Sequence, residues 1–416
     1  MVLKGDNSII ITNGLVITRD NILKGAIRIA GGLIEQVGDI PSTDKDEVVD
    51  AGGCHIAPAI IDFNVFAVDM KAAHFGGIAR VGLMPDLSTP LDLPSRVSYI
   101  CGTSYPDLRV HPLAAATKGL EGKELAEIAL MKQAGAKAVS TGRSWISDSG
   151  VMLRLMQYAA MLDLVVISHA EDAGLVGSGV ATAGEMATRL GLPSAPVEAE
   201  VLAVARDLAL AEMSEARVHF RQITTTSSLN LIRSAKARGV SVTAGITPAH
   251  FMLSDLATSD FRTFARLSPP LRSEADRMEV LAAIADGTID VVSSGHDPKG
   301  PEQKRQPFSD AEPGMVGAQT LLPLVLTLVR DKVIDLNRAF DLLAKNPATL
   351  LGVNAGEIVV GREADITLIN AEKPWVIDGN KMPASARNTP FDGQPVQGRA
   401  CKLWVGGQKA STEPAV

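Results

Sequence analysis

The chain has 416 residues, of which 46% are hydrophobic and 21% charged, and its formal net charge is −7. These values are ordinary for a soluble globular protein, and an acidic balance without a basic patch argues against a nucleic-acid surface. The cysteines Cys54, Cys101 and Cys401 form no Cys-x-x-Cys pair, so neither a disulfide framework nor a thiolate zinc site is predicted. Residues 1–7 contain no apolar targeting segment, and no apolar run is long enough to cross a bilayer. We therefore expect a cytoplasmic protein with no membrane partner.

The first fifty residues predict a small antiparallel sheet. Residues 8–49 alternate β-rich runs with turn signals at Asn13-Gly14 and Gly31-Gly32. Similar runs return near the other end of the chain, at 356–360, 364–369 and 401–407. We expect the two ends to pair into one small β-sandwich domain, composed of residues 1–57 and 356–416.

The middle of the chain alternates short Val- and Ile-rich runs with helical patterns, which is typical of repeated βα units and a parallel sheet. The candidate strands are residues 79–84, 137–140, 164–168, 217–220, 240–243 and 289–293. Helical patterns over 151–161, 198–213 and 275–284 separate them. The sequence predicts an α/β protein in which residues 58–355 form a (β/α)8 TIM barrel. Chemistry in such a barrel lies at the C-terminal ends of the strands.

Several motifs that build this scaffold resemble the dihydroorotases of the amidohydrolase superfamily. They are residues 53–62, Leu83-Met84-Pro85, Gly191-Leu192-Pro193, 268–274, Asn346-Pro347-Ala348 and Asn388-Thr389-Pro390-Phe391. The resemblance covers nearly the full length of the chain. It implies the barrel fold, metal-assisted opening of a cyclic amide at the strand ends, and a place in pyrimidine biosynthesis.

The positions at which this family holds its metals carry other residues here. The resemblance aligns two metal-binding His, the metal-bridging Asp, a further His and the Asp that acts as general base with Asn64, Phe66, Thr141, Gln222 and Gly295, respectively. His169 is the position that still matches a metal ligand. Zinc is held by imidazole, thiolate or carboxylate groups, and a general base needs a titratable side chain. We therefore expect no catalytic residue, no metal and no other cofactor.

The positions implied to bind substrate are changed as well. Val68 stands where the family has an Arg, and Asp86 and Ser268 stand where it has Asn. A carboxylate at position 86 would repel an anionic dihydroorotate.

On this resemblance we expect a chain that is not an enzyme. It would be a non-catalytic, dihydroorotase-like subunit that scaffolds aspartate transcarbamoylase in de novo pyrimidine biosynthesis. The implied partner is the aspartate transcarbamoylase catalytic chain, in a hetero-oligomer of six plus six subunits.

Two alternatives remain open. The first is a divergent amidohydrolase that acts on a cyclic amide C–N bond through a mononuclear metal site around His169 and His296, which stoichiometric metal would reveal. The second is a free-standing protein that binds a metabolite in the barrel cavity. Its stability would rise with that ligand.

Overall fold

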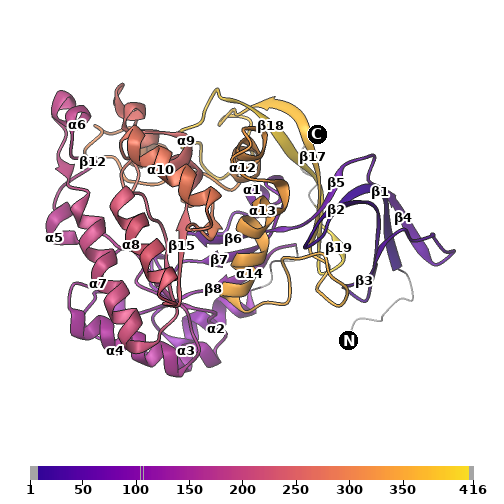
Figure 1. Ribbon diagram of the computed structural model, residues 1–416, viewed down its shortest axis with the longest axis horizontal. Coiled ribbons are helices and arrows are strands. Elements are labelled where there is room, and N and C mark those ends of the chain that lie inside the picture. Colours follow the sequence, from indigo (N-terminus) through magenta and orange to yellow (C-terminus); the bar gives the residue numbers. More distant parts are fainter. Residues whose placement is uncertain (1–7, 104, 106, 412–416) are drawn as a thin grey trace.

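The computed structural model describes residues 8–103, 105 and 107–411. Residues 1–7, on which the expected lack of a targeting segment partly depends, lie outside the described residues. Figure 1 shows two parts: a barrel surrounded by helices, and a sheet beside it in which the two ends of the chain meet. Across the described ranges, no helix is both long and apolar enough to cross a membrane.

The barrel contains eight strand positions, as the sequence predicts. Three parallel strands form its first part: β6 (Ile60–Val65), β7 (Ile78–Leu83) and β8 (Arg109–Pro112). Six more continue it: β9 (Ala114–Ala115), β10 (Val139–Ser140), β11 (Val166–Ser168), β14 (Val218–Phe220), β15 (Val242–Ile246) and β16 (Val291–Val292). Strands β8 and β9 are two halves of one position, separated by Leu113.

The barrel closes between its last and first strands. The backbone N–H of Phe66 donates to the carbonyl oxygen of His296 at 2.9 Å. The backbone N–H of Ser294 donates to Oδ1 of the fully buried Asp62 at 2.9 Å, and its hydroxyl donates to Oδ2 of the same carboxylate. This closure holds the segment after β6 against the segment after β16.

Helices follow the strands and cover the barrel. They are α1 (Met70–Phe75), α2 (Pro94–Gly102), α3 (Ile128–Gln133), α4 (Ser149–Met161), α5 (Ala173–Val176), α6 (Glu185–Leu190), α7 (Glu198–Ser214), α8 (Thr226–Ala237), α9 (Pro248–Met252), α10 (Glu274–Ala285), α11 (Pro301–Lys304), α12 (Leu321–Arg330), α13 (Leu336–Phe340) and α14 (Asn346–Leu351). Side-chain caps begin several of them: Asp148, Thr225 and Ser273 each accept the backbone N–H three residues later. A two-stranded pair, β12 (Ala181–Thr182) with β13 (Ser194–Ala195), lies among the outer loops.

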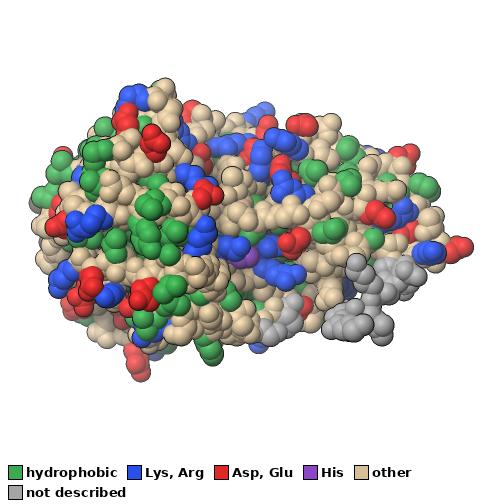
Figure 2. Space-filling model, turned by 90° about the horizontal axis from the view of Figure 1, so that it is seen from below, with side chains coloured by type: hydrophobic (Ala, Val, Ile, Leu, Met, Phe, Trp, Pro, Cys, Tyr) green, Lys and Arg blue, Asp and Glu red, His purple; other side chains and the backbone are tan. Residues whose placement is uncertain are grey.

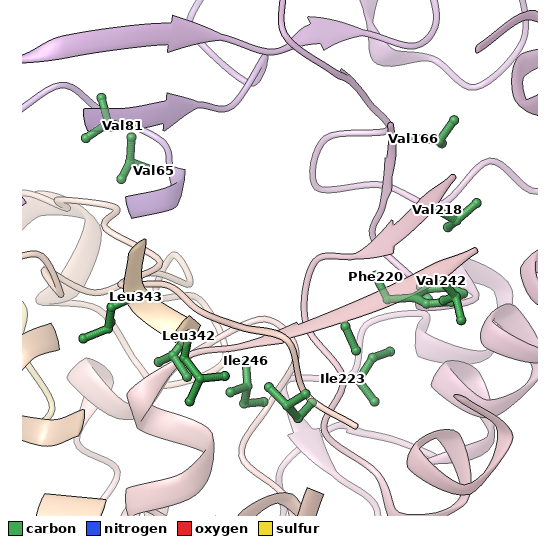
Figure 3. Close-up of a cluster of buried hydrophobic side chains, with 14 of the residues drawn as sticks. Val65, Val81, Val166, Val218, Phe220, Ile223, Val242, Ile246, Leu342 and Leu343 are labelled. Atoms are coloured by element: carbon green, nitrogen blue, oxygen red, sulfur yellow. The ribbon is translucent and has the colours of Figure 1, made fainter. Parts of the chain in front are cut away.

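The barrel strands are buried on both faces, because their side chains alternate between two cores. Val166 belongs to the large cluster between strands and helices, whereas Val165 and Ile167 belong to a cluster with Phe63. Figure 3 shows the large cluster, with Val166, Val218, Phe220 and Val242 drawn from neighbouring strands. Such continuous apolar runs are typical of parallel sheets covered by helices. The polar groups of the barrel are therefore concentrated where the strands end.

The two ends of the chain form one eight-stranded sheet, which confirms their predicted pairing. Its strands are β1 (Ser8–Ile17), β2 (Ile22–Ala30), β3 (Leu33–Gly38), β4 (Asp46–Asp50), β5 (His55–Pro58), β17 (Ile366–Val376), β18 (Pro395–Val405) and β19 (Gln408–Lys409). The join is the antiparallel pair β5–β17, in which Ile56 faces Leu368. Trp404 is buried in the core of this sheet. The domain boundaries at residues 57/58 and 355/356 stay a prediction.

Candidate functional site

A small pocket opens at the C-terminal ends of the barrel strands. Its walls include Phe66, Arg143, Arg221, Gln222, Thr247 and Asp297. Each of these residues follows a barrel strand, which is where TIM barrels carry their functional side chains.

The ring of Phe66 lies beneath two cations. The guanidinium carbon of Arg143 is 3.6 Å from the ring centroid, and that of Arg221 is 5.4 Å from it. Nη1 of Arg143 donates to Oδ2 of Asp297 at 2.8 Å. Burial, and then the charge of Arg143, lower the pKa of Arg221 to about 10, so Arg221 is still charged at neutral pH. Phe66, which stands where the family has a metal-binding His, thus packs against two arginines.

His169 is held between an arginine and a carboxylate. Nη2 of Arg221 lies 2.7 Å from Nδ1 of His169. A guanidinium can only donate, so Nδ1 accepts and the ring proton is on Nε2, which lies 3.4 Å from Oε2 of Glu171. Burial and the charge of Arg221 lower the pKa of His169. Neither nitrogen of the neutral ring retains a lone pair for a metal.

The other two histidines near the strand ends are also held by hydrogen bonds. Nδ1 of His296 accepts the backbone N–H groups of Gly317 and Ala318 at 3.3 and 3.4 Å, which leaves the proton on Nε2. Nε2 of His250 lies 3.1 Å from the carbonyl oxygen of Pro269 and therefore donates, while its Nδ1 accepts from Gln222 at 2.7 Å. Burial lowers the pKa of His250 to about 4. All three imidazoles thus take part in hydrogen bonds within the protein.

The residues present do not fit a catalytic metal. Such zinc sites use three protein ligands and a water, and in the described part of the chain no three His, Cys, Asp or Glu residues are grouped to hold an ion. Asn64 is buried, and neither of its side-chain polar atoms has a partner among the residues that the structure describes, but an amide is a poor zinc ligand. The arrangement of possible ligand atoms therefore does not support a mononuclear metal site around His169 and His296.

The structure brings four of the positions singled out from the sequence into one pocket. Phe66, Gln222, Ser268 and Gly295 all line the pocket. Thr141 does not line it, and its Oγ1 accepts the backbone N–H of His169 at 3.0 Å.

Two further positions have separate roles. Oδ1 of Asp86 accepts the backbone N–H of Arg143 at 2.8 Å. The negative charge of Asp86 therefore lies close to the arginines of the pocket. It would act on them as well as on a ligand. Val68 packs against the main barrel core and does not line the pocket.

Sequence reasoning missed several residues of the pocket, among them the polar residues Arg143, Arg221, Thr247 and His250. A signal was present, because Arg221 comes directly after β14 and Thr247 directly after β15. The resemblance to the family pointed only to positions that the family uses, so the residues next to them were not selected as candidates.

Residues 297–314 form one side of the pocket and are anchored by a buried lysine. Nζ of Lys304 donates to the carbonyl oxygens of Thr263 and Glu312 at 3.1 and 2.6 Å. Burial, and then the charge of Arg266, lower the pKa of Lys304 to about 7. This anchor holds Pro313 and its neighbours, which line the pocket, in place.

The fold and the strand-end pocket define a TIM-barrel protein of the amidohydrolase type. The L-hydantoinase (dihydropyrimidinase) of Arthrobacter aurescens has the same fold, with a TM-score of 0.87 at 22% identity over 98% of this chain and 97% of its own. A dihydropyrimidinase of Brevibacillus agri gives 0.84 at 21% identity, over 98% and 95% of the two chains.

Sequence comparison then defines the family. The family described as Dihydro-orotase-like matches residues 66–228. A protein of Syntrophotalea carbinolica named dihydroorotase is 38% identical over 96% of this chain and 98% of its own length. One of Pelotomaculum thermopropionicum, with the same name, is 39% identical over 91% and 92%. The chain belongs to the dihydroorotase-like family of amidohydrolases.

These comparisons contradict the expectation that the chain is not an enzyme. Relatives 36–38% identical over most of its length carry the name of an enzyme, and the proteins that share its fold are hydantoinases. The expectation rested on the replaced positions for metal binding, the general base and substrate binding. It left out the second set of polar residues, around Arg143 and Arg221, that line the same pocket.

Proposed function

We propose that this chain acts on the C–N bond of a small cyclic amide of the dihydroorotate class, at the pocket beside Phe66. The observation that carries the proposal is the position of this pocket at the strand ends, in a chain 38% identical to a protein named dihydroorotase. Its walls offer amide, hydroxyl and guanidinium groups from Gln222, Thr247 and Arg221. These groups match the carbonyl oxygens and N–H groups of a cyclic amide.

Asp297 is the carboxylate among the residues that line the pocket, and we assign it the role of general base. It would accept a proton from a water that adds to the amide carbon, and that proton would pass to the ring nitrogen as the C–N bond breaks. Its Oδ2 accepts from Arg143, and its Oδ1 lies 3.4 Å from Nζ of Lys299. Gln222 and Thr247, which also line the pocket, would offer hydrogen-bond donors to the oxygen on which charge develops.

The test is ring opening of dihydroorotate by the purified chain in the presence of a strong chelator. The proposal predicts turnover that Asp297→Asn abolishes. Asp310→Asn is the matched control, because Asp310 is an exposed acid in the same segment and its variant should retain full activity. No ring opening above the buffer rate, or equal rates in both variants, would contradict the proposal.

We propose separately that the chain associates with the aspartate transcarbamoylase catalytic chain, in six-plus-six stoichiometry. The resemblance to dihydroorotases supports this, and the surface offers apolar side chains for contact. Figure 2 shows hydrophobic side chains gathered on the barrel half of the face where α2, α3 and α4 lie. Tyr99, Leu130 and Met161 of these helices are exposed.

The test of association is co-expression of the two chains, followed by measurement of the mass of the purified particle. A single assembly of six copies of each chain is expected, and Met161→Asp should weaken it if this face takes part. Separate elution of the two chains at micromolar concentration would remove the partner from the account. A scaffolding role for the transcarbamoylase trimers depends on that result and is independent of catalysis.

A further inference from the structure

Four basic side chains meet near the starts of the barrel strands, at the end of the barrel opposite the pocket. Arg80 of β7 and Arg109 of β8 are partners in the register of these two parallel strands. His111 comes two residues after Arg109 and therefore shares its face of β8. The backbone N–H of Lys137 donates to the carbonyl oxygen of Pro112 at 3.1 Å, which places Lys137 beside them. We call Arg80, Arg109, His111 and Lys137 the basic cluster.

The basic cluster is accessible from solvent. β8 is the lowest of the strands β6, β7 and β8 in Figure 1, and Figure 2, which views the molecule from below, shows Lys and Arg side chains gathered around a histidine near the middle of that face. Arg109 is exposed and Lys137 is half-buried. Arg109 also packs closely on the turn between β18 and β19, because a Cβ added at Gly406 would lie 2.8 Å from its Nη2.

The cations of the cluster differ in how they are paired. Nε of Arg80 donates to Oδ2 of Asp365 at 2.5 Å, and its Nη2 donates to Oε2 of Glu363 at 2.6 Å. For the side chains of Arg109 and Lys137, by contrast, the described part of the chain supplies neither a hydrogen-bond acceptor nor an ion pair. Two positive charges of the cluster are therefore left without a counter-charge.

His111 reports a positive potential in the cluster. Its Nε2 lies 3.5 Å from Nη1 of Arg80. Burial, and then the charges of Arg80, Lys137 and Arg109, lower the pKa of His111 to about 3. Among the described residues, no carboxylate contributes to this shift of the pKa. The cations therefore outweigh Asp365 and Glu363 at the position of the ring.

A phosphate group matches these two free cations. A phosphate monoester carries between one and two negative charges at neutral pH and three acceptor oxygens. The planar guanidinium of Arg109 can donate two parallel hydrogen bonds to it, and the ammonium of Lys137 supplies a second charge. A nucleic acid would need a row of cations along several phosphates, whereas this cluster is large enough for one.

We propose that Arg109 and Lys137, beside His111, form a binding site for a single phosphate group, either free phosphate or the phosphate of a small metabolite. The sequence did not reveal the site, because its residues come from separate stretches of the chain. The inference goes beyond the proposed function and does not depend on it, since the cluster and the pocket lie at opposite ends of the barrel.

The test follows the imidazole signals of His111 by NMR while inorganic phosphate replaces chloride at constant ionic strength and neutral pH. His111→Gln assigns the signals. The wild-type chain should show a saturable shift with a dissociation constant of about 1 mM or lower. Arg109→Gln and Lys137→Gln should each weaken binding by about tenfold, because each removes a charged hydrogen-bond donor. Both side chains are accessible to solvent, so both variants are expected to fold.

Lys71→Gln is the matched control. Lys71 is an exposed lysine of α1, and it is not among the groups that act on His111. Its variant has the same change of net charge as Lys137→Gln and should bind phosphate as the wild-type chain does. Equal weakening in Lys71→Gln and Lys137→Gln would show a general effect of charge and would overturn the site.

Parallel titrations with adenosine monophosphate and with adenosine distinguish the two sources of the phosphate. Equal binding of inorganic phosphate and adenosine monophosphate would support a site for the phosphate group alone. Binding of the nucleotide about tenfold more tightly would support a phosphorylated metabolite as the ligand. A shift of His111 that does not saturate with phosphate or with the nucleotide, or one that adenosine produces equally well, would overturn the inference.

Discussion

Arg221 donates a hydrogen bond from Nη2 to Nδ1 of His169 over 2.7 Å, in a site where both side chains are buried. The arginine occupies the nitrogen that would otherwise be available to a metal and directs the ring proton toward Glu171. The segment with His169 and Glu171, which resembles part of a metal site in sequence, thus takes part in a series of polar contacts that begins at Arg221. The chemistry of the pocket then depends on its arginines, amides and one carboxylate.

Replacement of Arg221 by Met should raise the pKa of His169. The pKa is lowered by burial and, after burial, by the charge of Arg221. Removal of that charge leaves His169 beside Glu171, which favours the protonated ring. A pH titration of the imidazole signals by NMR would measure the change.

The same variant should lose about 1–3 kcal/mol of stability, because it leaves the buried Nδ1 of His169 without its hydrogen-bond donor. Arg399→Met, far from the ring, should leave the His169 titration unchanged. A His169 pKa that does not rise in Arg221→Met would show that the hydrogen bond is not formed in solution.

Restoring a side chain at Gly295 should destabilise the fold. Gly295 has φ of +59°, and an added Cβ would lie 3.0 Å from Cγ2 of Thr247. Gly31 has nearly the same φ, +57°, with nothing within 4 Å of an added Cβ. Gly31→Ala should therefore cost about 1–2 kcal/mol from the left-handed backbone alone. Gly295→Ala should cost about 1–3 kcal/mol more, because of overpacking.

Urea unfolding of the two alanine variants, beside the wild-type chain, measures that difference. If both lose the same stability, Thr247 does not restrict position 295. A family-type Asp could then be introduced there without strain.

The stability of the chain should fall in mild acid through its buried histidines. Burial lowers the pKa of His219 to about 3 and that of His250 to about 4, from an ordinary value of 6.5. Below pH 6.5 the unfolded chain binds protons that the native chain excludes, so each histidine removes about 1.4 kcal/mol per pH unit down to its native pKa. Above pH 6.5 neither group contributes to the slope.

His250→Gln isolates one of these contributions. Between pH 7 and pH 5 the variant should lose about 2 kcal/mol less stability than the wild-type chain, measured by urea unfolding at each pH. Equal losses in the two proteins would mean that His250 is protonated in the native state. The hydrogen bond from its Nε2 to Pro269 and the one from Gln222 to its Nδ1 could not then both be as described.

The sequence was sufficient for the fold because the fold depends on periodicity. Alternating β-rich and helical runs predicted the barrel, and the matching runs at the two ends predicted the shared sheet. The interruption at Leu113, which divides one barrel strand into β8 and β9, has no such signature. It depends on tertiary hydrogen bonds from Leu113 to Leu83 and from Ala114 to Ala138.

The site was only partly predictable, because its properties come from contacts between distant residues. The replaced positions were visible in the sequence, and Phe66, Gln222, Ser268 and Gly295 do meet in one pocket. The placement of Arg143 over Phe66, and the proton positions on His169, depend on rotamers and partners that no local pattern encodes. Without these contacts, the altered metal positions suggested that the chain is not an enzyme. The comparisons contradict that expectation.

The most direct test of the account is the zinc content of the chain after expression in zinc-supplemented medium and extensive dialysis. Because the nitrogens of His169, His250 and His296 are all used in hydrogen bonds or carry the ring proton, the account predicts far less than one zinc per chain. The hydrogen bond from Arg221 to His169 should persist in the same sample. Near-stoichiometric zinc that is lost in His169→Ala would contradict the account and show that the arginine gives way to a metal.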